Sequence, residues 1–167
     1  MFLLDSNAFI EAKNTYYSFE IAPGFWHWIE VAHSSGLLGS IGAVRDELMR
    51  QDDPLSDWAR DLPASFWVPE DDGTIGALQG LAAWAMNDAP SFRQQARTDF
   101  LASADYRLIA AAKAGHHVVV TREQSAPESK RRILIPDACM AHHVECISPF
   151  DAYRQLGLRL AAMDSGR

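Results

Sequence analysis

The chain has 167 residues, of which 48% are hydrophobic and 22% charged, and its formal net charge is −7. These values are typical of one globular domain with a substantial core. No apolar run has membrane-spanning length, and the apolar start is too short for a signal peptide. We therefore expect a cytoplasmic protein with no membrane segment. The acidic balance excludes general attraction to nucleic acid, so a polyanionic partner would require a local basic patch or metal ions.

The first ten residues, MFLLDSNAFI, are the most informative stretch. Four apolar residues run into Asp5, as expected for a buried strand of a parallel sheet. Asp5 would then lie at the carboxyl end of the strand, where ligands bind in open α/β sheets. Alternatively, Asp5 only caps the helix that follows, since Asp, Ser and Asn are all good N-caps. This stretch alone does not separate the two interpretations.

Strands and helices alternate along the rest of the chain. Further strands are expected at residues 37–41, 66–69, 117–121, 132–135 and 144–147. Helices are expected at residues 8–13, 25–34, 43–50, 55–61, 73–86, 104–114, 136–142 and 149–158, with an irregular stretch at 14–22. This alternation favours an α/β fold, with a mainly parallel sheet and helices on both faces.

Four acidic residues occupy comparable places in this alternation. Asp5 ends the first strand, Glu47 lies in the helix after the second, Asp105 opens the helix before strand 117–121, and Glu123 follows that strand. A doubly wound sheet brings such positions to one edge, where neighbouring carboxylates raise one another's pKa unless a cation is present. An all-oxygen ligand set suits Mg²⁺ or Mn²⁺. Taken singly, each acid is equally consistent with a solvated surface charge, or a helix cap in the case of Asp105.

Four segments together resemble the acidic motifs of the PIN-domain ribonucleases: MFLLDSNAFI, SIGAVRDEL, ASADYRLIAAA and VVVTRE. The stretches YYSFEIAPGFWHWIE and IPDAC further resemble a bacterial PIN-like subgroup of the DUF4411 type. The resemblance implies a three-layer α/β/α sandwich with a central, mainly parallel sheet. It would form a single PIN-like domain over residues 1–160, followed by a frayed tail at 161–167. Many PIN proteins are VapC-like toxins of toxin–antitoxin pairs, which cut RNA with Mg²⁺ or Mn²⁺.

The resemblance also assigns roles to residues. Asp5, Glu47 and Asp105 match the metal-binding and catalytic acids. Glu123 matches a fourth position that is usually Asp, and because Glu is longer its direct contact with metal is less certain. Two polar residues of the motifs are expected to hydrogen-bond the ligands: Asn7 and Thr121. The implied partners are an RNA substrate and a cognate DNA-binding antitoxin, and a homodimer is a further option.

Three other groups of residues have a functional and a structural interpretation. The basic run of Lys130, Arg131 and Arg132 either contacts substrate phosphates or is a solvated loop. The aromatic group either stacks on RNA bases or packs within the protein or between subunits; its members are Tyr16, Tyr17, Trp26 and Trp28. A zinc-like spacing, C-x-x-H-H-x-x-C, comprises Cys139, His142, His143 and Cys146. Its two cysteines fall on an expected helix and an apolar strand, so we predict reduced thiols and no structural zinc.

Two alternative functions remain. A phosphatase of the haloacid-dehalogenase type resembles this chain at the first strand, but that family has D-x-D where this chain has Asp5-Ser6-Asn7. The second alternative is a non-catalytic scaffold that binds RNA or a partner protein. Retention of all four acids argues against it, and metal-dependent RNA cleavage would separate the two.

Overall fold

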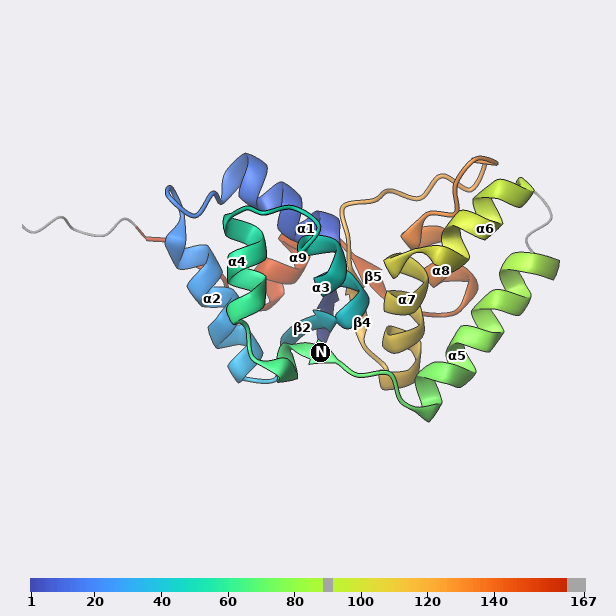
Figure 1. Ribbon diagram of the computed structural model, residues 1–167, viewed down its shortest axis with the longest axis horizontal. Helices are drawn as coiled ribbons and strands as arrows, with labels where there is room; N and C mark the ends of the chain where they lie inside the picture. The colour runs from blue at the N-terminus through green and yellow to red at the C-terminus, as the bar shows by residue number, and fades with distance from the viewer. Residues whose placement is uncertain (89–91, 162–167) are drawn as a thin grey trace, which may run out of the picture.

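The protein is built around a five-stranded parallel sheet (Figure 1), in a computed structural model that describes residues 1–88 and 92–161. The strand order is β3-β2-β1-β4-β5. The strands are β1 Phe2–Leu4, β2 Leu38–Ile41, β3 Trp67–Val68, β4 Val118–Val120 and β5 Cys146–Ile147. In the centre, Leu3 of β1 pairs with Gly39 of β2 on one side and Val119 of β4 on the other. The winding direction therefore reverses between β1 and β4, and ligands of such sheets bind outside the carboxyl ends of the strands at this switch point.

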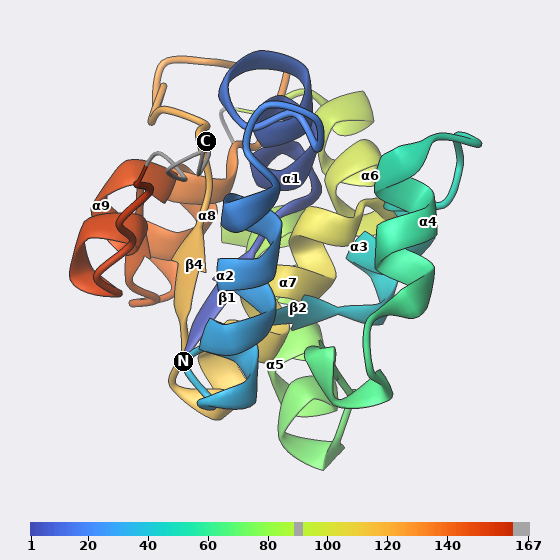
Figure 2. The same cartoon turned by 90° about the vertical axis from the view of Figure 1, so that its left-hand side faces the viewer.

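Helices cover both faces of the sheet, which confirms the predicted three-layer α/β/α sandwich. Helices α2, α4 and α9 lie on one side, and α5, α6, α7 and α8 lie on the other (Figures 1 and 2). The α-helices are α1 Ser6–Glu11, α2 Pro23–Ser34, α3 Gly42–Leu48, α4 Pro54–Asp61, α5 Asp72–Ala83, α6 Gln94–Ala102, α7 Ala104–Gly115, α8 Ile135–Ala141 and α9 Pro149–Gln155. Shorter turns are the π-helical η1 Ala12–Tyr16 and η3 Trp84–Asp88 and the 3-10 helix η2 Ala64–Phe66.

The central strands are buried on both faces, which is why they read as continuous apolar runs in the sequence. Leu3 and Leu4 of β1 and Val119 and Val120 of β4 have no exposed surface. Removing each of these side chains from water stabilises the fold by about 1.5–3 kcal/mol. Among the described residues, no helix is both long and apolar enough to cross a membrane.

The strand predicted at residues 132–135 is wrong. Residues 132–134 are irregular and Ile135 already begins α8. Ile133 and Ile135 are buried between less buried neighbours, which imitates the alternation of a strand. Ile133 packs into the core from the loop and Ile135 from the first position of α8, and neither pairs with a strand. The backbone N–H of Ile135 donates to the Glu123 carboxylate at 2.8 Å, and the strand position beside β4 is filled by β5.

The first helix is longer than the sequence indicates. It begins at Ser6, capped by Asp5, and continues through the π-turn η1 to Tyr16, although residues 14–22 were expected to be irregular. The π-turn closes with the Tyr17 N–H donating to the Ala12 carbonyl at 2.7 Å. This extension carries Asn14 onto the same side of the helix as residues near its start. Most of the predicted tail, residues 162–167, lies outside the described residues.

Candidate functional site

Asp5 follows β1 and is buried at the switch point, with 1% of its surface exposed. Its Oδ1 accepts the Ala8 N–H at 2.6 Å, so it caps α1, and its Oδ2 accepts the Thr121 hydroxyl at 2.7 Å. Burial raises the pKa of Asp5 to about 7, against the opposing effect of these two hydrogen bonds. The charges of Asp105 and Glu123 raise it further. The capping interpretation of Asp5 is therefore correct, and the same side chain also lies within electrostatic reach of two other acids.

Asp105 lies in the first turn of α7 but does not cap it. The cap is Ser103, whose Oγ accepts the Tyr106 N–H at 3.3 Å. Burial raises the pKa of Asp105 to about 6, with further increases from the charges of Glu123 and Glu47 and a decrease from Arg132. Within the described part of the chain, no donor makes a hydrogen bond to this carboxylate. Asp105 is thus a largely buried acid whose oxygens are available to a ligand.

Glu47 and Glu123 approach Asp105 from two further segments. Glu47 of α3 accepts the Ser6 hydroxyl at 2.7 Å. Glu123 is 12% exposed and accepts both from Arg132 at 2.9 Å and from the Ile135 N–H at 2.8 Å. The structure therefore brings all four predicted acids to the carboxyl edge of the sheet. The oxygens of Glu123, however, are already occupied by donors of the protein.

Thr121 links the ends of β1 and β4. Its hydroxyl donates to Asp5 and accepts the Glu123 N–H at 3.1 Å. It is 2% exposed. Thr121 was expected to hydrogen-bond one of the acids, and it contacts Asp5 because both residues directly follow neighbouring parallel strands. Asn7 instead lies exposed on the first turn of α1.

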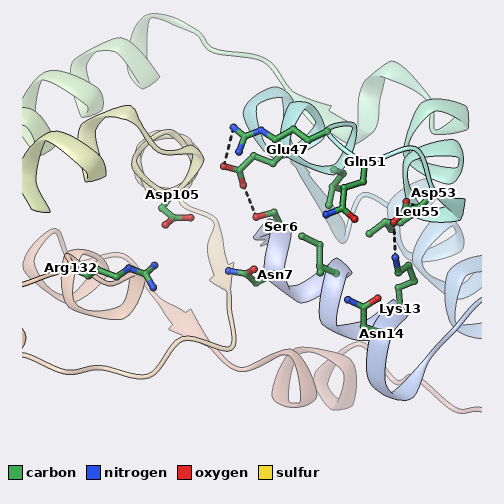
Figure 3. A pocket seen from close by; sticks show the side chains of 13 residues that line it. Ser6, Asn7, Lys13, Asn14, Glu47, Gln51, Asp53, Leu55, Asp105 and Arg132 are labelled. Atoms are coloured by element: carbon green, nitrogen blue, oxygen red, sulfur yellow. Dashed lines mark hydrogen bonds and ion pairs between the residues drawn. The ribbon is translucent and has the colours of Figure 1, made fainter.

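A pocket of about 410 Å³ opens beside these acids (Figure 3). Asp105 and Arg132 lie on one side of it and the α1 residues Ser6 and Asn7 on the other, with Glu47 above them in this view. The end away from Asp105, here called the far end, is lined by Lys13, Asn14, Gln51, Asp53 and Leu55 (Figure 3). Ile10, Leu48 and Arg50 also line the pocket. Sequence reasoning did not single out this far end. The helical spacing of Asn7, Ile10 and Asn14 could have indicated that they share one face of a helix. It was missed because residues 14–22 were expected to be irregular.

The basic run lies next to the same acids. Arg131 and Arg132 line a smaller pocket of about 150 Å³ together with Asp99, Ser103 and Asp105. The two pockets share Asp105 and Arg132. Arg131 and Arg132 therefore border the acids, whereas the exposed Lys130 lines neither pocket, and a contact of the run with substrate stays a prediction.

The four aromatic residues lie away from the acids, and three of them are packed in the fold. Trp26 is 3% exposed and stacks on Phe19, with ring centroids 4.2 Å apart. Tyr17 stacks on Phe25 at the same centroid distance, and Trp28 packs edge-on against Tyr153. Tyr16 is 60% exposed. The packing interpretation therefore accounts for Tyr17, Trp26 and Trp28.

The cysteines of the zinc-like spacing contact each other. The hydrogen bond that the Cys139 thiol donates to Cys146, together with burial, raises the pKa of Cys139 far above its usual range. His142 Nδ1 lies 3.2 Å from Lys113 Nζ, and its ring packs edge-on against Trp84. His143 adopts a left-handed backbone conformation with φ 57°. The absence of structural zinc stays a prediction that metal analysis can test.

No preformed metal centre exists among residues 1–88 and 92–161, where no three His, Cys, Asp or Glu side chains are arranged to hold an ion. The donor chemistry nevertheless fits a hard cation, since the acids are all carboxylates and their proximity raises the pKa values of Asp5 and Asp105. A divalent cation would stabilise the ionised forms of these two groups.

Comparison with known proteins yields one match. The profile of a family described as Domain of unknown function (DUF4411) matches residues 2–160. No curated protein and no solved structure matches the chain significantly. The match spans both the strands and the acids described above.

Proposed function

The chain belongs to the DUF4411 family, whose description names no activity, and we propose from its site that it is a metal-dependent endoribonuclease with a PIN-like fold. The observation that carries the proposal is the convergence of acids from four separate segments at the β1/β4 switch point. Burial, and after it the charges of neighbouring acids, raise the pKa of Asp5 to about 7 and that of Asp105 to about 6. Groups with such perturbed pKa values that converge beside a pocket are the usual mark of a reactive site.

Asp5, Glu47 and Asp105 are the residues proposed to hold Mg²⁺ or Mn²⁺. Bound there, the ion would lower the pKa of an attacking water and neutralise charge on the phosphate. Glu123 is the least suited of the four acids to a direct contact, because Arg132 forms a 2.9 Å ion pair with it and this positive charge opposes that of a metal ion. Its role in the proposal is to hold Arg132 beside Asp105 and to add negative charge near the ion.

Neighbouring residues position the acids and the substrate. The Thr121 hydroxyl fixes one oxygen of Asp5, and Ser6 fixes Glu47. Arg131 and Arg132 border the acids and supply the local positive charge that a protein of net charge −7 needs to hold a phosphodiester. Hydrolysis forms a bond from water oxygen to phosphorus as the bond to the leaving ribose oxygen breaks.

The biological role proposed with this activity is that of a toxin in a bacterial toxin–antitoxin pair. This part rests on the resemblance of the acidic motifs to those of VapC-like proteins. A small adjacent gene for a DNA-binding protein, and a complex of the two proteins that suppresses RNA cleavage, would support it. Co-expression that neither forms a complex nor changes the activity would contradict it.

The experiment that tests the activity is cleavage of a mixed RNA pool with Mn²⁺, with EDTA, and with single variants. Asp5→Asn, Glu47→Gln and Asp105→Asn are expected to reduce cleavage by orders of magnitude, because metal activation of water and phosphate is the main catalytic device proposed. Glu123→Gln is expected to cost less. Cleavage that persists in EDTA, or an Asp5→Asn protein that cuts at the parent rate, would refute the mechanism and favour a non-catalytic scaffold.

A further inference from the structure

The far end of the 410 Å³ pocket presents amide side chains that the fold does not use. Asn14 and Gln51 line this end, Asn7 lines the same pocket between them and Asp105, and all three are exposed (Figure 3). In the part of the chain that the structure describes, none of the three amide groups makes a hydrogen bond within the protein. Each carries two donor hydrogens and an acceptor oxygen. Three unused amides around one pocket offer hydrogen bonds to a neutral ligand that has both donors and acceptors.

The lining of the pocket is both polar and apolar. Asn7 and Asn14 come from the continuous α1–η1 helix, and Gln51 follows α3 on the facing side (Figure 3). The apolar lining residues are Ile10, Leu48 and Leu55; Ile10 is half-buried and is the most accessible of them, since Leu48 and Leu55 have only 3% and 2% of their surface exposed. Amide groups beside some apolar surface suit a flat ring whose edge carries donors and acceptors.

Lys13, the cation labelled at this end in Figure 3, is paired within the protein. Lys13 Nζ lies 2.6 Å from Asp53, which is itself held in place as the N-cap of α4. Arg50 extends away from this end, towards Glu47, at 3.8 Å (Figure 3). A second phosphate at the far end would have to displace the Lys13–Asp53 pair, whereas a neutral ring would leave it intact. The far end therefore differs in character from the Asp105–Arg132 end, where the acids and the basic run meet.

We propose that the far end of the pocket binds one unstacked nucleobase of single-stranded RNA, next to the phosphodiester that is cut, and that Asn14 and Gln51 select which base. Unstacked bases in single strands are read by hydrogen bonds to their edges, which an amide can match on both its donor and acceptor sides. The inference rests on the proposed function, because Asp105 and Glu47 line the same pocket and so place the base beside the reacting group. It adds a source of sequence preference to that function.

The test uses Gln51→Met, Asn14→Leu and the double variant, which keep side-chain size but remove the amides. Gln79→Met is the matched control, since Gln79 is an exposed amide of α5 that lines none of the pockets described above. Binding of labelled six-nucleotide A, C, G and U homopolymers is measured by fluorescence anisotropy in EDTA, and cleavage sites in an RNA pool are sequenced with Mn²⁺. Melting temperatures check that every variant is folded.

The wild type is expected to prefer one homopolymer and to cut beside that base. The double variant should lose about 5- to 100-fold in affinity for the preferred homopolymer and much less for the others, as expected when hydrogen bonds to a base edge are removed. The Gln79→Met control should match the wild type. If the variants still bind and cut with the wild-type preference, or weaken all four homopolymers equally, base reading is wrong while the nuclease proposal stands. If the wild type neither binds nor cuts RNA, the nuclease proposal fails, and the inference fails with it.

Discussion

Replacing Asp5 by Asn tests whether the fold raises the pKa of this acid. The unfolded chain ionises Asp5 at a pKa near 3.8, whereas the folded protein does so near 7. Between these values the native state keeps a proton that the unfolded state has lost. The stability that Asp5 contributes is therefore fully present below pH 3.8 and is lost as the pH rises through about 7.

The size of the effect follows from the two pKa values. Relative to low pH, the titration of Asp5 lowers the free energy of unfolding by about 2 kcal/mol at pH 5 and by about 4 kcal/mol at pH 8. Asn cannot ionise, and its amide oxygen can still accept the Ala8 N–H. The free energy of unfolding of Asp5→Asn, relative to wild type, should therefore rise by about 3 kcal/mol between pH 5 and pH 8, the difference taken before rounding.

The assay is urea unfolding followed by the fluorescence of the five tryptophans, in EDTA, at the two pH values. Using the difference between variant and wild type cancels the titration of the six histidines, which both proteins share. Asp61→Asn is the control, because Asp61 is an exposed acid at the end of α4. A variant-minus-wild-type difference that is the same at both pH values, or that falls towards pH 8, would refute the argument.

Three further predictions concern the neighbourhood of the acids and the zinc-like spacing. Changing Lys130, Arg131 and Arg132 together to Ala should weaken RNA binding, as measured by titrations at several salt concentrations. The log–log slope of affinity against salt should become shallower by about 0.7 per lost phosphate contact, and unchanged affinity at low salt would remove these residues from the site. Thr121→Val should lower the free energy of unfolding by about 1–3 kcal/mol in urea, because it removes a buried hydroxyl that both donates and accepts; a variant as stable as wild type would contradict this. Metal analysis should find less than about half an equivalent of zinc in protein purified without chelator, whereas a structural site would hold close to one; stoichiometric zinc that is lost in Cys139→Ser would overturn the prediction.

The sequence by itself determined the layered α/β fold and the placement of the acids along it. Parallel strands are buried on both faces, so their residues do not alternate between apolar and polar. Strands such as the one at residues 117–121 were therefore recognisable from the sequence without knowing which strands they pair with. Asp5 and Glu123 come directly after such runs, and the carboxyl ends of parallel strands share one edge. Their convergence with Glu47 and Asp105 was expected on the condition that the sheet is doubly wound, which the strand order of the structure meets.

Only the tertiary structure decided what each side chain does at that edge. The apolar alternation around Ile133 resembles that of a strand, but the place beside β4 belongs to β5, so that segment stays irregular and its backbone binds Glu123. The π-turn that brings Asn14 into the same pocket as Gln51 closes with the hydrogen bond from the Tyr17 N–H to the Ala12 carbonyl, which residue patterns do not indicate. Local sequence patterns indicate burial and periodicity. Strand pairs and hydrogen bonds between residues distant along the chain depend instead on which of several possible partners the packed fold brings closest.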